Sequence, residues 1–137
     1  MRGLLCMKGL DNKLQNFINA NLRLREAVLK FAQNSDDLFR DGLIQRFEFT
    51  YELAWKTLKN YLESIGIVDR NSPKAVIKEA FAQKLLEDED TWLLMLKDRN
   101  YTAHVYNEEL ALEIAKRITT LYVNEFEKLI KVMGHEE

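Results

Sequence analysis

The chain has very few residues that interrupt a helix: a single proline, Pro73, and five glycines that stand far apart in 137 residues. Its apolar residues recur at intervals of three and four rather than two, which is the period of an amphipathic helix. We therefore expect an all-α fold, a compact antiparallel bundle of about five helices. The length favours one domain. We place this domain at residues 11–133, between a loosely attached or disordered segment 1–10 and a frayed tail 134–137.

Five stretches follow the helical period. They span residues 11–34, 41–65, 73–86, 87 to a point between 99 and 106, and 107–133. The second stretch has the widest and most aromatic apolar face, so we expect it at the centre of the core. The pattern also predicts inward-facing side chains in the first, third and last stretches: Leu14, Phe17, Ile18, Leu22, Val28 and Leu29; Val76, Ile77, Ala80 and Phe81; and Leu110, Ile114, Ile118, Leu121, Phe126, Leu129 and Ile130.

Local signals mark several helix ends. Ser72 followed by Pro73 predicts a helix start, because serine accepts from first-turn amides and proline lacks an N–H that would be unpaired there. Asn107 predicts another start by the same capping chemistry. Gly66 predicts the end of the second helix in a left-handed conformation, with Ile67 closing over the last turn.

The charge balance and the single cysteine exclude several classes of protein. With 20 basic and 22 acidic residues the formal charge is −2, which argues against a protein that coats nucleic acid and leaves room for a local basic site. Cys6 cannot form an internal disulfide, and no stretch reaches the length of an apolar membrane span. We therefore expect a cytoplasmic protein that makes no membrane contact.

The common nucleotide-binding and metal-binding patterns are also missing. The glycines are too dispersed to form a phosphate-cradling loop, so we expect no cofactor and no nucleotidyltransferase active site. Asp88 and Asp90 have the spacing of a magnesium-binding pair, but no glycine-serine helix start precedes them. An acidic helix N-terminus explains the same residues, and we expect no metal site.

By elimination, acid–base chemistry near neutral pH falls to His104, because the other histidine lies in the predicted tail. Arg99 precedes it by five residues, which turns a helix by about 500°, so the two positions diverge by about 140°. Either the helix breaks there or a partner brings the two side chains together. Arginine and histidine suit metal-independent cleavage of RNA, with guanidinium on the phosphate and imidazole on the 2′-hydroxyl proton. Alternatively, Arg99 pairs with an acidic neighbour and His104 packs at a helix end.

Two segments carry a resemblance to a known family. The sequence RNYTAHVY (residues 99–106) matches the R-x4-H-x-Y signature of HEPN-domain proteins, and RFEFTYELAWK (residues 46–56) looks like the second-helix hallmark of those paired with minimal nucleotidyltransferases. The resemblance covers residues 14–133. It implies a dimerising helical bundle whose partner is a separately encoded, cognate minimal nucleotidyltransferase.

The resemblance implies two alternative functions. In the first, the homodimer is the ribonuclease toxin of a toxin-antitoxin pair: Arg99 binds the RNA phosphate, His104 is the acid–base group, Asn100 supports the cleft, and the transferase silences the protein by transferring AMP to Tyr106. In the second, the protein is a non-catalytic subunit that presents a nucleotide or other substrate to the transferase. A third hypothesis, outside this family, is an unrelated helical interaction module.

The second-helix segment contains further candidate substrate-binding residues, Arg46, Glu48 and Lys56. A structural role explains part of this set equally well. Lys56 lies four residues after Glu52 and can form an ordinary helix ion pair with it, and Arg46 can pair with an acidic neighbour.

Overall fold

The computed structural model describes residues 4–104 and 107–134, with side chains described for residues 12–102 and 107–134. These residues form helices without a strand among them, as expected: α1 (Leu4–Gln33), α2 (Asp37–Ser64), α3 (Pro73–Ala82), α4 (Glu89–His104), α5 (Glu108–Arg117), the π-helix η1 (Ile118–Tyr122) and α6 (Val123–Gly134). Since α5, η1 and α6 follow one another without a loop, the described part of the chain makes five helical rods.

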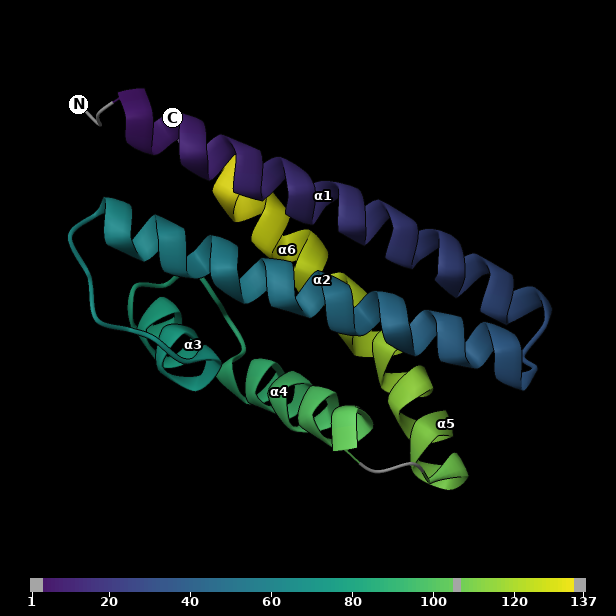
Figure 1. The fold of residues 1–137 in the computed structure, drawn as a ribbon. Coiled ribbons are helices and arrows are strands. Elements are labelled where there is room, and N and C mark those ends of the chain that lie inside the picture. Colours follow the sequence, from purple (N-terminus) through teal and green to yellow (C-terminus); the bar gives the residue numbers. More distant parts are fainter. Residues whose placement is uncertain (1–3, 105–106, 135–137) are drawn as a thin grey trace.

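Helix α2 is the centre of the bundle. Figure 1 shows α1 and α2 lying side by side, with α3 and α4 next to α2 on the side away from α1. Helix α5 also contacts α2, while α6 packs on α1. The expectation that the aromatic face of α2 forms the core is confirmed, since its buried residues include Leu43, Phe47, Tyr51, Ala54, Leu58 and Leu62.

Aromatic rings join α2 to the last rod. Phe47 stacks on Tyr122 with ring centroids 5.2 Å apart, and Phe126 lies edge-on to Trp92 at 5.6 Å. All four side chains are fully buried. Such ring pairs stabilise beyond the apolar area that they bury, so this cluster fixes α2 and α4 against η1 and α6.

Helices α1 and α2 begin earlier than expected. The helical backbone of α1 starts at Leu4 and that of α2 at Asp37, where the Asp36 side chain accepts from the Phe39 N–H. In α1 the expected inward positions Leu22 and Leu29 are wrong, because they are 56% and 66% exposed. Phe17 is buried as expected, and the rest of the buried stripe follows a neighbouring line of residues: Ala20, Asn21, Leu24 and Ala27.

The end of α2 is confirmed. Gly66 has φ +92°, and the Ile67 N–H donates to the Leu62 carbonyl at 2.8 Å. Helix α3 ends earlier than expected because Lys84 takes the same left-handed role with φ 65°, and the Leu85 N–H donates to the Ala80 carbonyl. A lysine carries no glycine signal at such a position, which is why the sequence pattern overran this end.

Phe81, at the end of α3, was expected to face inward. That expectation is wrong, because the side chain is 42% exposed.

The starting signals of the helices are confirmed. Ser72 accepts from the Ala75 N–H at 3.2 Å, and Asn107 accepts from the Leu110 N–H at 3.1 Å.

The π-helix η1 changes the phase of the last rod. Leu121 was expected to face inward but is 44% exposed, whereas Tyr122 is fully buried. A π-turn places one more residue in a turn than an α-helix does. The inward position therefore passes from residue 121 to residue 122, a shift that a regular 3.6-residue pattern does not predict.

Candidate active site

The R-x4-H segment lies at the end of α4, and the helix is continuous from Glu89 to His104. The backbone therefore does not break between Arg99 and His104, and the two positions point about 140° apart around the helix axis. Arg99 and His104 could be brought together by a break in the helix or by a partner, and the continuous helix excludes the break. Within one chain these two positions do not share a face of α4.

Arg99 is held by an acidic residue of α2. Its Nη2 lies 2.9 Å from Oε1 of Glu52, and each side chain is 30% exposed. The other oxygen of Glu52 accepts from the indole N–H of Trp55 at 3.2 Å and lies 3.8 Å from Nζ of Lys56. The Glu52 carboxylate thus orients the guanidinium of Arg99 from one side. The buried Nε of Arg99 has no hydrogen-bond partner among the described residues.

A second contact joins the same two helices one turn away. The Thr102 hydroxyl donates to Oε2 of Glu48 at 2.7 Å. Glu48 and Glu52 are four residues apart on α2, while their partners Thr102 and Arg99 are three residues apart in the opposite order on α4. The two helices are therefore antiparallel here, and two carboxylates of α2 line up along the face of α4 that carries Arg99.

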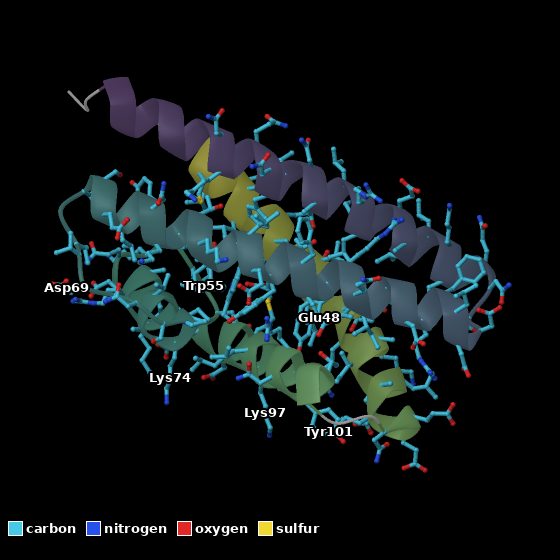
Figure 2. The ribbon with its side chains drawn as sticks, in the orientation of Figure 1. Glu48, Trp55, Asp69, Lys74, Lys97 and Tyr101 are labelled. Carbon is cyan, nitrogen blue, oxygen red and sulfur yellow. The ribbon has the colours of Figure 1, made fainter. Side chains whose placement is uncertain are left out.

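A cavity opens next to this pair of contacts. It has a volume of about 220 Å³ and lies where α2, the end of α4 and the start of α5 meet. Figure 2 labels Glu48 on α2 and Tyr101 near the end of α4, and both side chains line the cavity. The remaining lining residues are Asp41, Ile44, Gln45, Thr102, Asn107, Ala111 and Ile114.

Beneath Arg99, a buried carboxylate fixes α4 to the last rod. Asp98 is 4% exposed and accepts two hydrogen bonds from Arg117, both at 2.8 Å, and a third from the Tyr122 hydroxyl. The hydrogen bond to Asp98 raises the pKa of the Arg117 guanidinium, and burial, followed by the bond to Asp98, raises the pKa of the Tyr122 hydroxyl. Both groups therefore stay protonated at neutral pH.

Sequence reasoning missed this cluster, although a signal was present. Asp98 follows Trp92 and Met95 at intervals of three, on the stripe of α4 that faces inward. A charged residue on a buried stripe needs a partner of opposite charge. That partner, Arg117, sits on another helix and carries no mark of its own in the sequence.

Tyr51 adds a neutral hydroxyl behind the site. Burial raises the pKa of its hydroxyl well above the usual value, and the nearby Glu52 carboxylate raises it further, partly offset by Arg99. The side chain is fully buried, and its oxygen has no hydrogen-bond partner among the described groups. Tyr51 is therefore a protonated phenol within electrostatic reach of the Arg99–Glu52 pair.

The other candidate residues lie in different surroundings. Asn100 is exposed on α4. Arg46 faces α1, where it donates to the Arg23 carbonyl at 2.8 Å and lies 3.9 Å from Glu26. The side chain of His104 and the whole of Tyr106 lie outside the described residues, so the contacts of these two candidates stay predictions.

Of the acidic pair at the start of α4, Asp88 caps the helix and Asp90 lies in its first turn. Asp88 accepts from the backbone N–H and the hydroxyl of Thr91 at 3.0 and 2.6 Å.

Within the described part of the chain, no group of three or more histidine, cysteine or acidic side chains is arranged to hold a metal ion. Over the same residues, no helix combines the length and the apolar character needed to cross a membrane.

Known structures share this fold. A protein from Thermus thermophilus is 36% identical with a TM-score of 0.71, over 86% of this chain and 96% of that one. HI0074 from Haemophilus influenzae, described as the fold of a substrate-binding domain of a nucleotidyltransferase, is 25% identical with a TM-score of 0.80, over 89% and 99%. A chain of the MntA-HepT toxin-antitoxin structure is 18% identical with a TM-score of 0.78, over 91% and 99%, and shows the fold alone.

A curated relative and a family model extend these similarities to the sequence. The chain is 33% identical over 81 residues to a probable ribonuclease HepT of Haemophilus influenzae, and the match spans 56% of each protein. The family described as nucleotidyltransferase substrate binding protein like matches residues 12–135, which include both segments that carry the HEPN resemblance. With a match over nearly its whole length, the chain belongs to the family described as nucleotidyltransferase substrate binding protein like.

Proposed function

We propose that the protein is the ribonuclease toxin of a toxin-antitoxin pair, acting as a homodimer on RNA without a metal ion. Arg99 binds the scissile phosphate, His104 takes the proton of the 2′-hydroxyl, and Asn100 supports the cleft. The 2′-oxygen then attacks phosphorus, the bond to the 5′-oxygen breaks, and His104 returns its proton to that oxygen, so that a cyclic phosphate and a free 5′-hydroxyl result. The partly exposed guanidinium of Arg99 suits it to phosphate, which arginine binds in a bidentate manner.

The unbroken helix from Arg99 to His104 is the observation that carries the proposal of a dimer. Because the two positions diverge around α4, an arginine and a histidine share one cleft only when a second copy supplies one of them. A two-fold axis near the end of α4 brings the motif next to its own copy. Light scattering on the purified protein should give twice the chain mass, and a monomer at working concentration contradicts the composite site.

Regulation follows from the same site. A separately encoded minimal nucleotidyltransferase transfers AMP to Tyr106. The AMP group adds bulk and negative charge close to the arginine and histidine of the motif, and it repels the RNA phosphate. The family description and the HI0074 relative support a nucleotidyltransferase partner. Incubation with that transferase and ATP should add one AMP per chain by intact mass, and Tyr106→Phe should abolish the adduct.

The ribonuclease proposal is tested by RNA cleavage in the presence of EDTA. We expect cleavage by the wild type and a loss of at least about a hundredfold in Arg99→Ala and His104→Ala, because each removes a group used in the chemical step. Arg25→Ala is the matched control. Arg25 is also an arginine in an ion pair, with Glu127, and is half exposed, but it lies outside the R-x4-H motif. Cleavage that survives in Arg99→Ala and His104→Ala contradicts the proposed roles.

A non-catalytic substrate-binding subunit is the second candidate function. The description of HI0074 as having the fold of a substrate-binding domain favours it. This candidate predicts that purified wild-type protein cleaves no RNA, that expression of the wild type and of His104→Ala affects growth equally, and that the protein raises the activity of the transferase. These outcomes separate the two candidates in one set of strains.

A further inference from the structure

We propose that the cavity between α2, α4 and α5 is a base-binding subsite that selects an unpaired guanine, placing the guanine nucleotide's phosphate next to Arg99. This inference rests on the proposed function, since it names the substrate feature that the RNA-binding site recognises. The cavity has a volume of about 220 Å³, which is larger than the roughly 150 Å³ of an engineered cavity that binds one benzene ring. A bicyclic base therefore has room in the cavity, and the sugar and phosphate can extend from its open side.

The charge of the lining decides which part of a nucleotide enters. Glu48 and Asp41 both line the cavity, and none of the described residues that line it is an arginine or a lysine. Arg40 lies 3.5 Å from Asp41 and offsets its charge, whereas the partner of Glu48 is the uncharged Thr102 hydroxyl. The Glu48 carboxylate therefore repels a phosphate and attracts N–H donors, so the uncharged base enters the cavity and the phosphate stays outside. Tyr101 supplies an aromatic ring in the same lining, which is the usual stacking surface for an unpaired base.

Arg99 lies at the correct separation for that phosphate. Thr102, which lines the cavity, follows Arg99 by one turn of α4, and its hydroxyl lies 3.1 Å from the Arg99 carbonyl oxygen. On α2, Glu48 in the cavity lies one turn from Glu52, which holds the guanidinium. The base subsite and the phosphate-binding side chain are thus about 5 Å apart along the helices, which one sugar bridges.

The orientation of Glu48 selects guanine among the bases. The Thr102 hydroxyl donates to Oε2 at 2.7 Å and holds the carboxylate in place. Each carboxylate oxygen has two lone pairs, so both oxygens can still accept from the ligand. Guanine presents two adjacent donors, N1–H and the N2 amino group, which match a carboxylate. Adenine and cytosine present a ring acceptor beside a single amino group, and uracil has one donor between two carbonyls.

Binding of short oligonucleotides tests the subsite separately from catalysis. The probes are fluorescein-labelled pentanucleotides of deoxythymidine with guanine, adenine or thymine at the centre, which lack the 2′-hydroxyl and are not cleaved. Fluorescence anisotropy should give about tenfold tighter binding of the guanine probe, the preference expected of one bidentate contact to a base. Glu48→Gln keeps the shape, replaces one acceptor with a donor, and should reduce the preference to less than about twofold.

Two further variants complete the test. Glu63→Gln, an exposed carboxylate on the same helix that pairs with Lys59, should keep the preference of about tenfold. Thr102→Val removes the hydroxyl that orients Glu48 and should lower the preference about threefold, which gives a second measurement if Glu48→Gln melts at a lower temperature than the wild type. Equal binding of the three probes, a preference for adenine, no binding, or a guanine preference that survives in Glu48→Gln overturns the inference.

The inference and the proposed function fail in different ways. RNA cleavage in EDTA with no guanine preference among the probes leaves the ribonuclease standing and removes the subsite. A guanine preference that depends on Glu48, in a protein that cleaves no RNA, keeps the subsite and removes the ribonuclease.

Discussion

Oε1 of Glu52 lies 2.9 Å from Nη2 of Arg99, so the side chain proposed to bind phosphate is already paired with a carboxylate of the neighbouring helix. An RNA phosphate that approaches the guanidinium meets the negative charge of Glu52 at the same site. The pair orients Arg99, and it also opposes the binding of an anion. Glu52 therefore sets a balance between orientation and affinity.

This relationship predicts the effect of Glu52→Gln. The substitution keeps one oxygen that can accept from Arg99, replaces the oxygen that accepts from Trp55 with an amino group, and removes the competing charge. We expect binding of single-stranded RNA to become roughly fivefold tighter, which corresponds to about 1 kcal/mol for a partly exposed ion pair. Fluorescence anisotropy at two salt concentrations measures the change in affinity. The gain in affinity should be smaller at the higher salt concentration.

The control for this change is Glu63→Gln, which removes the same charge from another turn of α2, where Glu63 pairs with Lys59. An equal gain in both variants would assign the effect to net charge rather than to the pair with Arg99. Weaker binding in Glu52→Gln would show that orientation of the guanidinium outweighs the repulsion.

Asp98 predicts a stability effect next to the same residue. Asp98→Asn keeps the shape but removes the charge that Arg117 and Tyr122 donate to, and a hydrogen bond to a charged group contributes about 1.5–3 kcal/mol. We expect the free energy of unfolding to fall by roughly 2–3 kcal/mol, measured by urea denaturation at pH 7. Asp90→Asn, an exposed acidic residue on the same helix, should change it by less than about 0.5 kcal/mol.

The bundle was predictable because its signals are local. The caps at Ser72 and Asn107 and the glycine at Gly66 each depend on a few adjacent residues, and the structure confirms all three. The apolar face of α2 was equally clear, since it contacts α1, α3, α4 and α5 and needs apolar residues around most of its circumference. The end of α3 was missed because Lys84 adopts the left-handed conformation without being a glycine.

The candidate site was predictable only as a list of residues. The motif gave Arg99 and His104, but their partners depend on how distant helices pair. Glu52 was interpreted as the partner of Lys56 within α2, and its shorter contact is with Arg99 on α4. No periodicity within one helix specifies such a contact, because it is set by the antiparallel packing of α2 on α4.

The π-helix predicts a reversal of the usual core pattern in the last rod. Leu121 has the helical spacing of a core residue but is 44% exposed, so Leu121→Ala should cost less than about 1 kcal/mol of unfolding free energy. Ile118, three residues earlier, is fully buried, and Ile118→Ala should cost about 2–5 kcal/mol. Thermal and urea denaturation measure both. Equal losses would mean that the rod keeps a regular α-helical phase in solution.

The cap of α4 predicts a dependence on pH. Hydrogen bonds from the side chain and then the backbone of Thr91 lower the pKa of the Asp88 carboxyl below its usual value. A carboxyl whose pKa is lower in the folded state stabilises the fold above its unfolded pKa of about 3.9, and this contribution is lost as the pH falls through the folded value. Asp88→Ala should therefore lower the free energy of unfolding by about 1 kcal/mol at pH 7, as for other N-cap residues.

Below about pH 4 that difference between the wild type and Asp88→Ala should shrink, because protonation weakens the cap in the wild type alone. Urea denaturation at pH 7, 4 and 3 measures it. Asp90→Ala provides the control, since Asp90 stands in the first turn of α4, where it stabilises the helix dipole without capping a backbone N–H. A difference for Asp88→Ala that stays constant down to the lowest pH would contradict a charged cap and would assign the effect to the neutral hydrogen bonds with Thr91.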